Sequence, residues 1–290
     1  MKPIILAIVG PTASGKTALS IKLAKALDGE IVSADSRQVY RGLDLASGKV
    51  TRREMRGVPH HMLDVCSLKR TYTVADYQKQ AYKVIDDILK RDKLPIIVGG
   101  SGQYVDAIIK GVIVPEVPPN IALRRKLNPI SLKLHGASKL FKILKRLDPE
   151  RAKQIDANNP RRLVRAIEIA TALGKVPKLV AKPRYEPIVI GIQPRIYDLR
   201  FKIHERIQRR VRAGMINEIK KLHKSGVSWK RLQSLGLECT DISAYLQGKL
   251  NKQEMLTQLE THIIQYSKRQ MTWWKRDKDI VWHNGDEKLI

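Results

Sequence analysis

The sequence predicts an α/β fold in which a parallel sheet carries helices on both faces and a helical lobe is inserted into the chain. Two features indicate the parallel sheet. Short, fully apolar segments alternate with amphipathic helical segments, and the first of them runs directly into a glycine-rich loop and a helix. A third feature, a basic and strand-free segment in the middle of the chain, indicates the lobe.

The elements predicted before residue 111 alternate between strands and helices. Residues 3–9 are apolar and predict a buried strand, and the spacing of apolar residues after the loop at 10–17 predicts an amphipathic helix over 17–28. We then expect a strand at 30–34, a helix over 74–92, a strand at 94–98 and, after a Gly-Gly-Ser-Gly turn, a further helix.

The pattern changes after residue 111. Closely spaced prolines at 115–119 cannot continue a helix or a central strand, and they predict a hinge. We place the inserted lobe at 118–185 and the core at 1–117 and 186–290. Past the lobe, the patterns predict a strand at 188–192, helices over 198–225, 238–247 and 251–275, and a last strand at 280–282.

Charge is the clearest bulk property of the chain. Of its 290 residues, 55 are lysine or arginine and 28 are acidic, which gives a net charge of +27, and residues 121–220 alone carry +17. This concentration predicts a polyanionic partner such as nucleic acid, because each neutralised phosphate releases counterions. No apolar run approaches the ~20 residues that cross a bilayer, and the isolated Cys66 and Cys239 predict neither a zinc site nor a disulfide framework. We therefore expect a cytoplasmic protein without membrane contact.

A phosphate-binding loop follows the first predicted strand. Residues 10–17 read GPTASGKT and match the pattern G-x-x-x-x-G-K-[ST] in its strand–loop–helix context. Glycines let backbone N–H groups point at an anion, and the helix N-terminus adds partial positive charge. Lys16 supplies a mobile cation, and the Thr17 hydroxyl is a ligand for Mg²⁺. We expect a P-loop NTPase-like core whose diphosphate- or nucleotide-binding residues are Gly10, Pro11, Thr12, Ala13, Ser14, Gly15, Lys16 and Thr17.

The acidic residue that completes an ATPase site does not follow the expected strand. Such enzymes hold magnesium with an acidic residue at the end of a second strand, whereas the strand at 94–98 is followed by Gly99, Gly100 and Ser101. The sequence therefore favours a P-loop small-molecule kinase or a group transferase that holds a leaving diphosphate.

Asp35 is the candidate general base. It ends the second predicted strand, and ligands bind at the carboxyl ends of strands in open parallel sheets. Taken alone, Asp35 would equally suit a structural turn. The neighbouring Ser36, Arg37, Gln38 and Tyr40 offer hydrogen-bonding and stacking groups that suit a nucleobase, which favours the catalytic interpretation.

Together these motifs resemble those of the tRNA dimethylallyltransferases, also called tRNA isopentenyltransferases. The likeness covers nearly the whole chain. It rests on the order and spacing of GPTASGKT (10–17), DSRQVYRGLD (35–44), VPHHMLDV (58–65), YTVADY (72–77), LPIIVGGSGQY (94–104), DPERAKQIDANNPRRLVRAIEI (148–169) and YSKRQMTWWKRD (266–277). The resemblance implies a P-loop-type core with a helical insertion.

The resemblance also implies a reaction. A dimethylallyl group would move from dimethylallyl diphosphate to N6 of the adenosine immediately 3′ of the anticodon in tRNA, releasing diphosphate. Asp35 matches the general base, and Thr17 and an arginine would stabilise the diphosphate. Arg206 matches that arginine best and Arg200 is a second candidate, although both would also fit an ordinary basic helix face. We expect a monomer that uses Mg²⁺.

The remaining implied residues are contacts to tRNA. They are Asp35, Ser36, Arg37, Gln38, Ser101, Arg124, Arg161, Arg162, Leu163, Val164 and Arg165. The chain departs from the family pattern in two places: Ser101 stands where threonine is usual, and Gly48-Lys49-Val50 stands where alanine-lysine-proline is usual. Trp273 and Trp274 could stack on RNA or close the core. Two alternatives remain, a kinase and a basic RNA-binding protein switched by a nucleotide, but a kinase would not need +17 in its middle segment.

Overall fold

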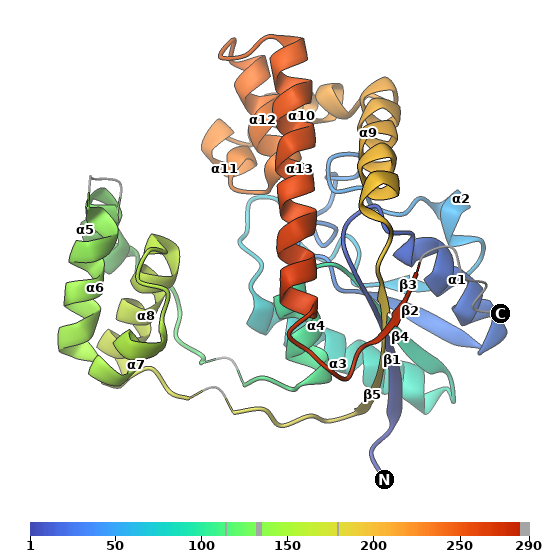
Figure 1. Cartoon of the computed structure of the whole chain (residues 1–290), viewed down its shortest axis with the longest axis horizontal. Helices are drawn as coiled ribbons and strands as arrows, with labels where there is room; N and C mark the ends of the chain where they lie inside the picture. Colours follow the sequence, from blue (N-terminus) through green and yellow to red (C-terminus); the bar gives the residue numbers. More distant parts are fainter. Residues whose placement is uncertain (114, 132–134, 179, 285–290) are drawn as a thin grey trace. The chain divides into compact units, whose positions relative to one another are not determined.

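The computed structural model describes residues 1–113, 115–131, 135–178 and 180–284. It divides into two compact units, one formed by Met1–Val112 together with Lys182–Ile290 and the other by Ile113–Ala181. The first unit contains the sheet and the second is helical (Figure 1). The predicted lobe, 118–185, differs from the second unit by a few residues at each end.

In the described part of the chain, six strands form one fully parallel sheet, which confirms the predicted fold class. Their order across the sheet is β3-β2-β4-β1-β5-β6. Strand β1 is central, with Leu6 opposite Ile96 on one side and Ile188 on the other. The loop after β1 therefore lies in the middle of the carboxyl edge. The strands are β1 (Ile4–Val9), β2 (Gly29–Ser33), β3 (His60–His61), β4 (Leu94–Val98), β5 (Glu186–Ile192) and β6 (Val281–His283).

Both faces of the sheet are covered by helices, because alternate residues of each strand point to opposite sides. In β1, Leu6 and Ile8 pack with Ile21 of α1 (Lys16–Ala26) on one face. On the other face, Ala7 belongs to the cluster that contains Ile85 of α3 (Val74–Lys90). Helix α4 (Gly102–Ile109) joins that second cluster. The three helices predicted in this part of the core are confirmed.

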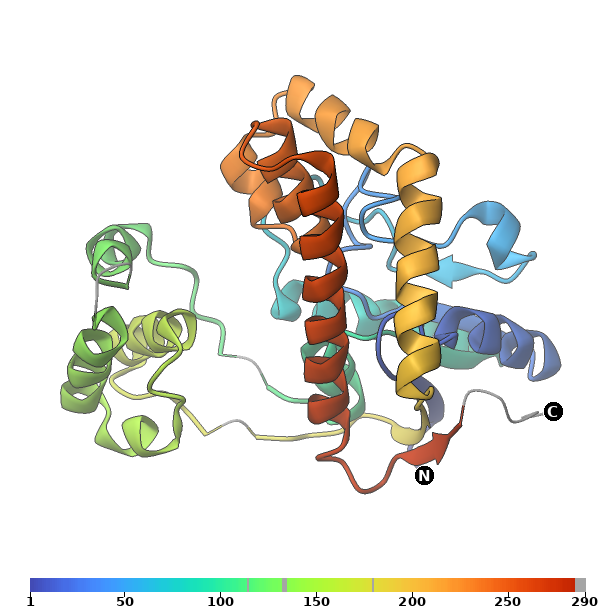
Figure 2. The ribbon, with the colours of Figure 1, turned by 45° about the horizontal axis from the view of Figure 1, so that its top comes forward.

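A group of helices follows β5 (Figure 1). Helices α9 and α13 contact each other and run side by side in both Figure 1 and Figure 2. The single helix predicted over 198–225 is wrong, because Gly214 adopts a left-handed conformation with φ 103° and separates α9 from α10. The helices are α9 (Ile196–Arg212), α10 (Met215–Lys224), α11 (Trp229–Gln233), α12 (Leu237–Leu246) and α13 (Lys252–Trp274).

The second unit has its own hydrophobic core. Leu127, Leu140, Leu144 and Leu163 are at most 5% exposed and pack together. The side chain of Asn159 accepts a hydrogen bond from the Arg162 backbone N–H, at 3.2 Å, and so caps α8 at its N-terminus. The helices of this unit are α5 (Ile121–Ser131), α6 (Gly136–Leu147), α7 (Pro149–Gln154) and α8 (Pro160–Leu173).

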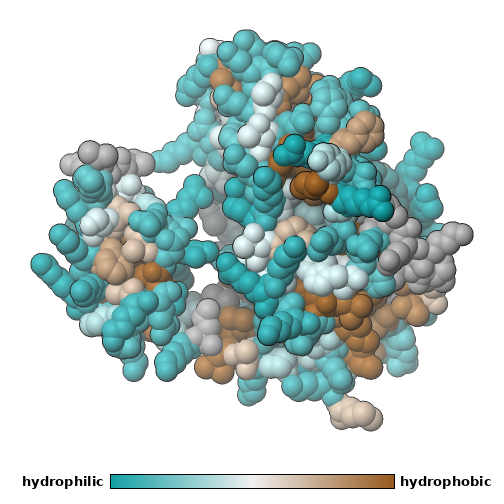
Figure 3. All heavy atoms as spheres, in the orientation of Figure 1, coloured by the Kyte–Doolittle hydropathy of each residue, from teal (hydrophilic) through white to brown (hydrophobic). Residues whose placement is uncertain are grey.

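Three short elements were not predicted. They are α2 (Arg52–Met55), the strand β3 and the helix α11. Elements of two to five residues are too short to show a period, so their conformation depends on their neighbours. Among the described residues, none of the helices is long and apolar enough to cross a membrane. Hydrophilic side chains cover most of the visible surface in Figure 3, as the abundance of lysine and arginine leads one to expect.

Candidate active site

The phosphate-binding loop connects the end of β1 to the start of α1. Gly10 has φ 142°, and a Cβ at this position would collide with the backbone carbonyl of Ile192 on β5. Gly15 has φ 93° and occupies the N-cap of α1, with no side-chain cap on the helix. The free N–H groups of the first turn and the partial positive charge of the helix therefore face the loop. This arrangement suits an anion.

Lys16 folds back onto the loop. Its Nζ donates to the backbone oxygen of Pro11 at 2.5 Å and lies 3.5 Å from Oγ of Ser14. Burial of the ammonium group, reinforced by the positive charge of Arg206, lowers the pKa of Lys16 to about 7. A lysine poised near neutrality gains a full charge when an anion binds beside it.

Two helices from the C-terminal third of the chain, α9 and α13, hold the phosphate-binding loop. Oε1 of Gln270, on α13, accepts from the Thr12 N–H at 2.8 Å, and its Nε2 donates to the Gly100 oxygen at 2.9 Å. Arg206, on α9, donates from Nη1 to Oγ1 of Thr12 at 2.9 Å. Arg200, the alternative arginine, is exposed on the same helix. The structure therefore brings Arg206, and not Arg200, to the loop.

Asp35 lies at the carboxyl end of β2. Its Oδ1 accepts from the backbone N–H groups of Arg37 at 2.8 Å and Gln38 at 3.4 Å. Asp35 therefore does form the structural turn that the sequence also allowed. Oδ2 makes no hydrogen bond to the residues that the structure describes, and this second oxygen is available to accept a proton.

Ser101 joins this group from the neighbouring strand. It is the N-cap residue of α4, directly beyond β4, and its Oγ accepts from the Ser36 N–H at 3.1 Å. Strands β2, β4 and β1 are consecutive in the sheet. Asp35, Ser101 and the phosphate-binding loop therefore occupy three successive strand ends on one edge.

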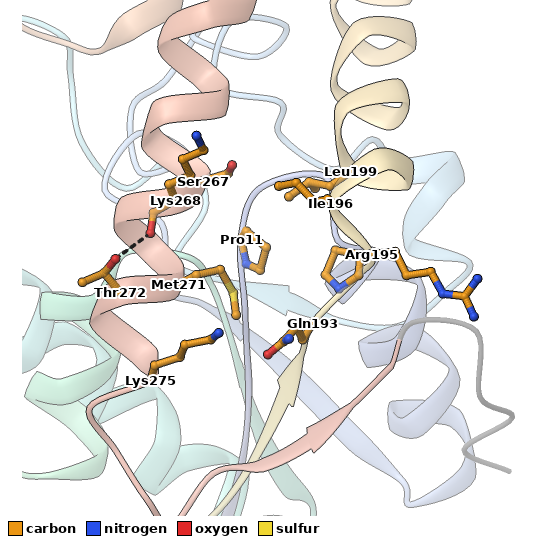
Figure 4. Close-up of a pocket in the computed structure, with 11 residues that line it drawn as sticks. Pro11, Gln193, Arg195, Ile196, Leu199, Ser267, Lys268, Met271, Thr272 and Lys275 are labelled. Atoms are coloured by element: carbon orange, nitrogen blue, oxygen red, sulfur yellow. Dashed lines mark hydrogen bonds between the residues drawn. The ribbon is translucent and has the colours of Figure 1, made fainter.

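A hollow of about 430 Å³ lies beside the loop, between the N-terminal end of α9 and the C-terminal half of α13 (Figure 4). Pro11 forms one wall, and Met271 of α13 and Lys275, just past the end of that helix, point toward the space beside it (Figure 4). The lining residues are apolar, neutral polar or cationic, and none carries a carboxylate. Of the cations, Lys275 points into the hollow, whereas the guanidinium of Arg195 points away from it (Figure 4). Its residues are Pro11, Gln193, Pro194, Arg195, Ile196, Leu199, Ser267, Lys268, Met271, Thr272 and Lys275.

The predicted tRNA contacts of the second unit divide into two kinds. Arg161 and Arg162 are exposed at the start of α8. Leu163 and Val164 are at most 7% exposed and belong to the core of this unit. A helix turns 100° per residue, so neighbours in sequence cannot all share an outward face. The side chains of Leu163 and Val164 therefore serve packing, and the contact of this segment with tRNA stays a prediction.

Arg124 and Arg165 are tied to one buried carboxylate. Glu168 accepts from Nε and Nη2 of Arg124 at 2.6 and 2.8 Å, and from Nη1 of Arg165 at 3.2 Å. Its side chain is fully buried, whereas both arginines keep about a third or more of their surface exposed. Both guanidinium groups therefore remain partly accessible while their orientation is held.

The two tryptophans also differ from each other. Trp274 is 1% exposed and belongs to the core, and Trp273 donates from Nε1 to Oδ2 of Asp106 at 3.2 Å. The sequence did not predict the role of Gln270, although this residue lies within the motif YSKRQMTWWKRD (266–277). Gln270 contacts Thr12 across 258 positions, and no local pattern reveals such a contact.

These features agree with comparisons to known proteins. A family model described as "IPP transferase" matches residues 38–277. The chain belongs to this family. Among curated proteins it is similar to "tRNA dimethylallyltransferase 1" of Syntrophus aciditrophicus, with 39% identity over 98% of this chain and 94% of the relative. It is also similar to "tRNA dimethylallyltransferase 2" of Treponema denticola, with 42% identity over 93% of this chain and 90% of the relative.

Solved structures of other proteins resemble this chain as well. A crystal structure of the tRNA isopentenylpyrophosphate transferase of Bacillus halodurans matches with a TM-score of 0.74 and 34% identity, over 100% of this chain and 92% of that one. A eukaryotic dimethylallyltransferase described as acting on tRNA shares the fold, with a TM-score of 0.78 and 22% identity, over 98% of this chain and 74% of that one.

Proposed function

We propose that this protein transfers a dimethylallyl group from dimethylallyl diphosphate to N6 of the adenosine immediately 3′ of the anticodon in tRNA, and releases diphosphate. The observation that carries the proposal is the shared strand edge. The loop for a diphosphate, with Lys16 and Arg206, lies two strands away from Asp35, whose free Oδ2 can take a proton. The names of the relatives point to the same reaction.

Each group has a defined task in this reaction. The N6 lone pair of the adenine attacks C1 of the dimethylallyl group, and the bond from C1 to the diphosphate oxygen breaks with its electron pair. Asp35 takes the proton that N6 loses. The leaving diphosphate gains negative charge, and Lys16, Arg206 and the N–H groups of the loop stabilise that charge as it develops.

Magnesium fits the loop as a partner of the diphosphate. Thr17, at the start of α1, is exposed, so its hydroxyl can reach a hydrated ion. Among the residues that the structure describes, no group of three or more His, Cys, Asp or Glu side chains could hold a metal by itself. Mg²⁺ would therefore arrive with the diphosphate and neutralise part of its charge.

The two substrates need separate approaches, because the amine must attack C1 from the side opposite the diphosphate. The hollow in Figure 4 borders Pro11 of the loop, and its lining combines cations with apolar groups. These properties suit a short prenyl diphosphate. The side bearing Asp35 and Ser101 remains for the adenine, which must leave its stack at a cost of a few kcal/mol.

A labelling experiment tests the proposed reaction. The full chain is incubated with purified bulk tRNA, Mg²⁺ and either labelled dimethylallyl diphosphate or γ-labelled ATP. We expect the prenyl label of dimethylallyl diphosphate to enter tRNA, and the γ-phosphate label of ATP to enter neither RNA nor a small molecule. Transfer of the γ-phosphate to a small acceptor would establish the kinase instead. Incorporation into neither, with tRNA bound, would leave only an RNA-binding protein. An anticodon stem-loop with guanosine in place of the target adenosine is the matched control.

A further inference from the structure

Arg210 is a buried arginine without a role in the proposed reaction. It lies on α9 one turn beyond Arg206 and is 8% exposed. Its Nη1 donates to Oε1 of Glu238 at 3.3 Å. Its Nη2 is buried and has no hydrogen-bond partner among the residues that the structure describes. A buried guanidinium nitrogen without an acceptor costs free energy, so the position calls for a ligand atom.

Gly48 makes room for this guanidinium group. A Cβ at position 48 would overlap Nη2 of Arg210 and Nη2 of Arg206, so the two guanidinium groups occupy the space that a methyl group would fill. The backbone of Gly48 has φ 62°, and its oxygen accepts from Nε2 of Gln38 at 3.3 Å. Any side chain at position 48 would therefore collide with Arg210 where it stands.

The two arginines repel each other, and burial strengthens the repulsion. Burial and the charge of Arg210 lower the pKa of Arg206 to about 10, and burial also lowers the pKa of Arg210. The carboxylates that act on them most are Glu238 and Asp35. The exposed Arg209 also acts on both arginines, and the exposed Glu54 interacts with Arg206 and Arg209. With Lys16 protonated, four cations face three carboxylates, and the exposed members of each kind are one cation and one carboxylate. The site therefore has an excess of buried positive charge that a bound anion would balance.

We propose that Arg210 is a second guanidinium for the leaving diphosphate, which it holds together with Arg206. Gly48 leaves the room that the two guanidinium groups occupy. This inference rests on the proposed function. Two neighbouring guanidinium groups present planar sets of donors that match phosphate oxygens. The diphosphate, rather than an RNA phosphate, is the ligand because Arg206 is anchored on Thr12 of the loop, and Arg210 adjoins Arg206.

Calorimetry with inorganic diphosphate and Mg²⁺, on the full chain without RNA, tests the inference. Arg210→Met removes the charge at similar length and should raise the dissociation constant about tenfold or more, the usual weight of a charged hydrogen bond. Arg210→Lys should recover part of the loss. Arg212→Met, an exposed arginine on the same helix, is the matched control and should bind like the parent. Equal affinity in Arg210→Met and the parent would overturn the inference.

A double-mutant cycle tests the role of Gly48. Gly48→Ala should weaken diphosphate binding in the parent, because the new methyl group displaces both guanidinium groups. It should weaken binding less in Arg210→Met, where the collision with Arg210 is gone and only the one with Arg206 remains. Equal effects in both backgrounds would show that the guanidinium does not use this space. Thermal unfolding of each variant shows whether it is folded.

Two further results distinguish a failure of the role proposed for Arg210 from a failure of the proposed function. If Arg210→Met binds diphosphate like the parent but loses tRNA affinity, the ligand is an RNA phosphate and the inference is overturned. If the parent itself binds diphosphate no better than Lys16→Ala does, the loop is not a diphosphate site, and the proposed function fails first.

Discussion

The chemistry of this site depends on side chains whose surroundings change their ordinary behaviour. Lys16 is half-buried, and burial of its ammonium group near the charge of Arg206 lowers its pKa to about 7. Asp35 is held by two backbone N–H groups through one oxygen, while the other has no hydrogen-bond partner in the part of the chain that the structure describes. Hydrogen bonds to the backbone orient both side chains. They leave Nζ of Lys16 able to gain a proton and Oδ2 of Asp35 able to accept one.

Lys16 predicts a proton-linked diphosphate affinity. Because a bound anion raises the pKa of Lys16 from about 7, binding should take up a proton above pH 7, and affinity should fall as pH rises from 7 toward 10. Calorimetry in buffers of different ionisation enthalpy measures the uptake. Lys16→Met should show weaker binding without this proton uptake. A parent affinity that stays constant between pH 7 and 9 would contradict the prediction.

Asp35→Asn should keep the affinity for both substrates and lower the rate of transfer by ~10²–10⁴, because the amide cannot accept the proton from N6. Single-turnover kinetics near saturation measure the rate. Asp28→Asn is the matched control, since Asp28 is exposed and precedes β2, at the opposite edge of the sheet from Asp35. A transfer rate in Asp35→Asn equal to that of the parent would remove Asp35 from the mechanism.

Helices α9 and α13 complete the phosphate-binding loop. The strand–loop–helix unit supplies N–H groups and Lys16, but the loop backbone is tied down by Gln270 and the Thr12 side chain by Arg206. Gln270 also bonds the Gly100 oxygen, next to Ser101. One side chain of α13 therefore links the diphosphate side of the site to the side that bears Ser101.

Gln270→Met should weaken diphosphate binding about tenfold and lower the free energy of unfolding by ~1–3 kcal/mol, because it leaves the Thr12 N–H and the Gly100 oxygen without their partner. Calorimetry and urea denaturation measure the two effects. Gln265→Met, at an exposed position of the same helix, is the control. If both variants behave alike, Gln270 does not hold the loop.

Under the proposed function, the reaction and RNA binding would be divided between the two units. The phosphate-binding loop, Asp35, Ser101, Arg206 and Gln270 all belong to the first unit. The second unit has an independent core and a strongly basic surface, with Arg161 and Arg162 exposed on α8. Such a division would let the grip on RNA change without changing the site of the reaction.

Alanine at both Arg161 and Arg162 should raise the tRNA dissociation constant and reduce the slope of its salt dependence by about two units, one for each lost phosphate contact. Diphosphate affinity should be unchanged. Alanine at Lys139 and Lys142, exposed on α6, removes the same charge from another helix of this unit. Equal salt slopes in the two double variants would mean that α8 makes no special contact with RNA.

The sequence by itself determined the parallel sheet, the phosphate-binding loop and the basic inserted segment, because each depends on local patterns. Apolar periodicity marks buried strands, and glycine spacing marks the loop. It also singled out Asp35 and Arg206, but partly through resemblance to a family. Tertiary structure alone decided that Arg206 rather than Arg200 reaches Thr12 and that Leu163 and Val164 are core residues. It also revealed the links from Gln270 to the loop and from Arg210 to Gly48. Those contacts join residues far apart in the chain, and only the packing of helices on the sheet brings them together.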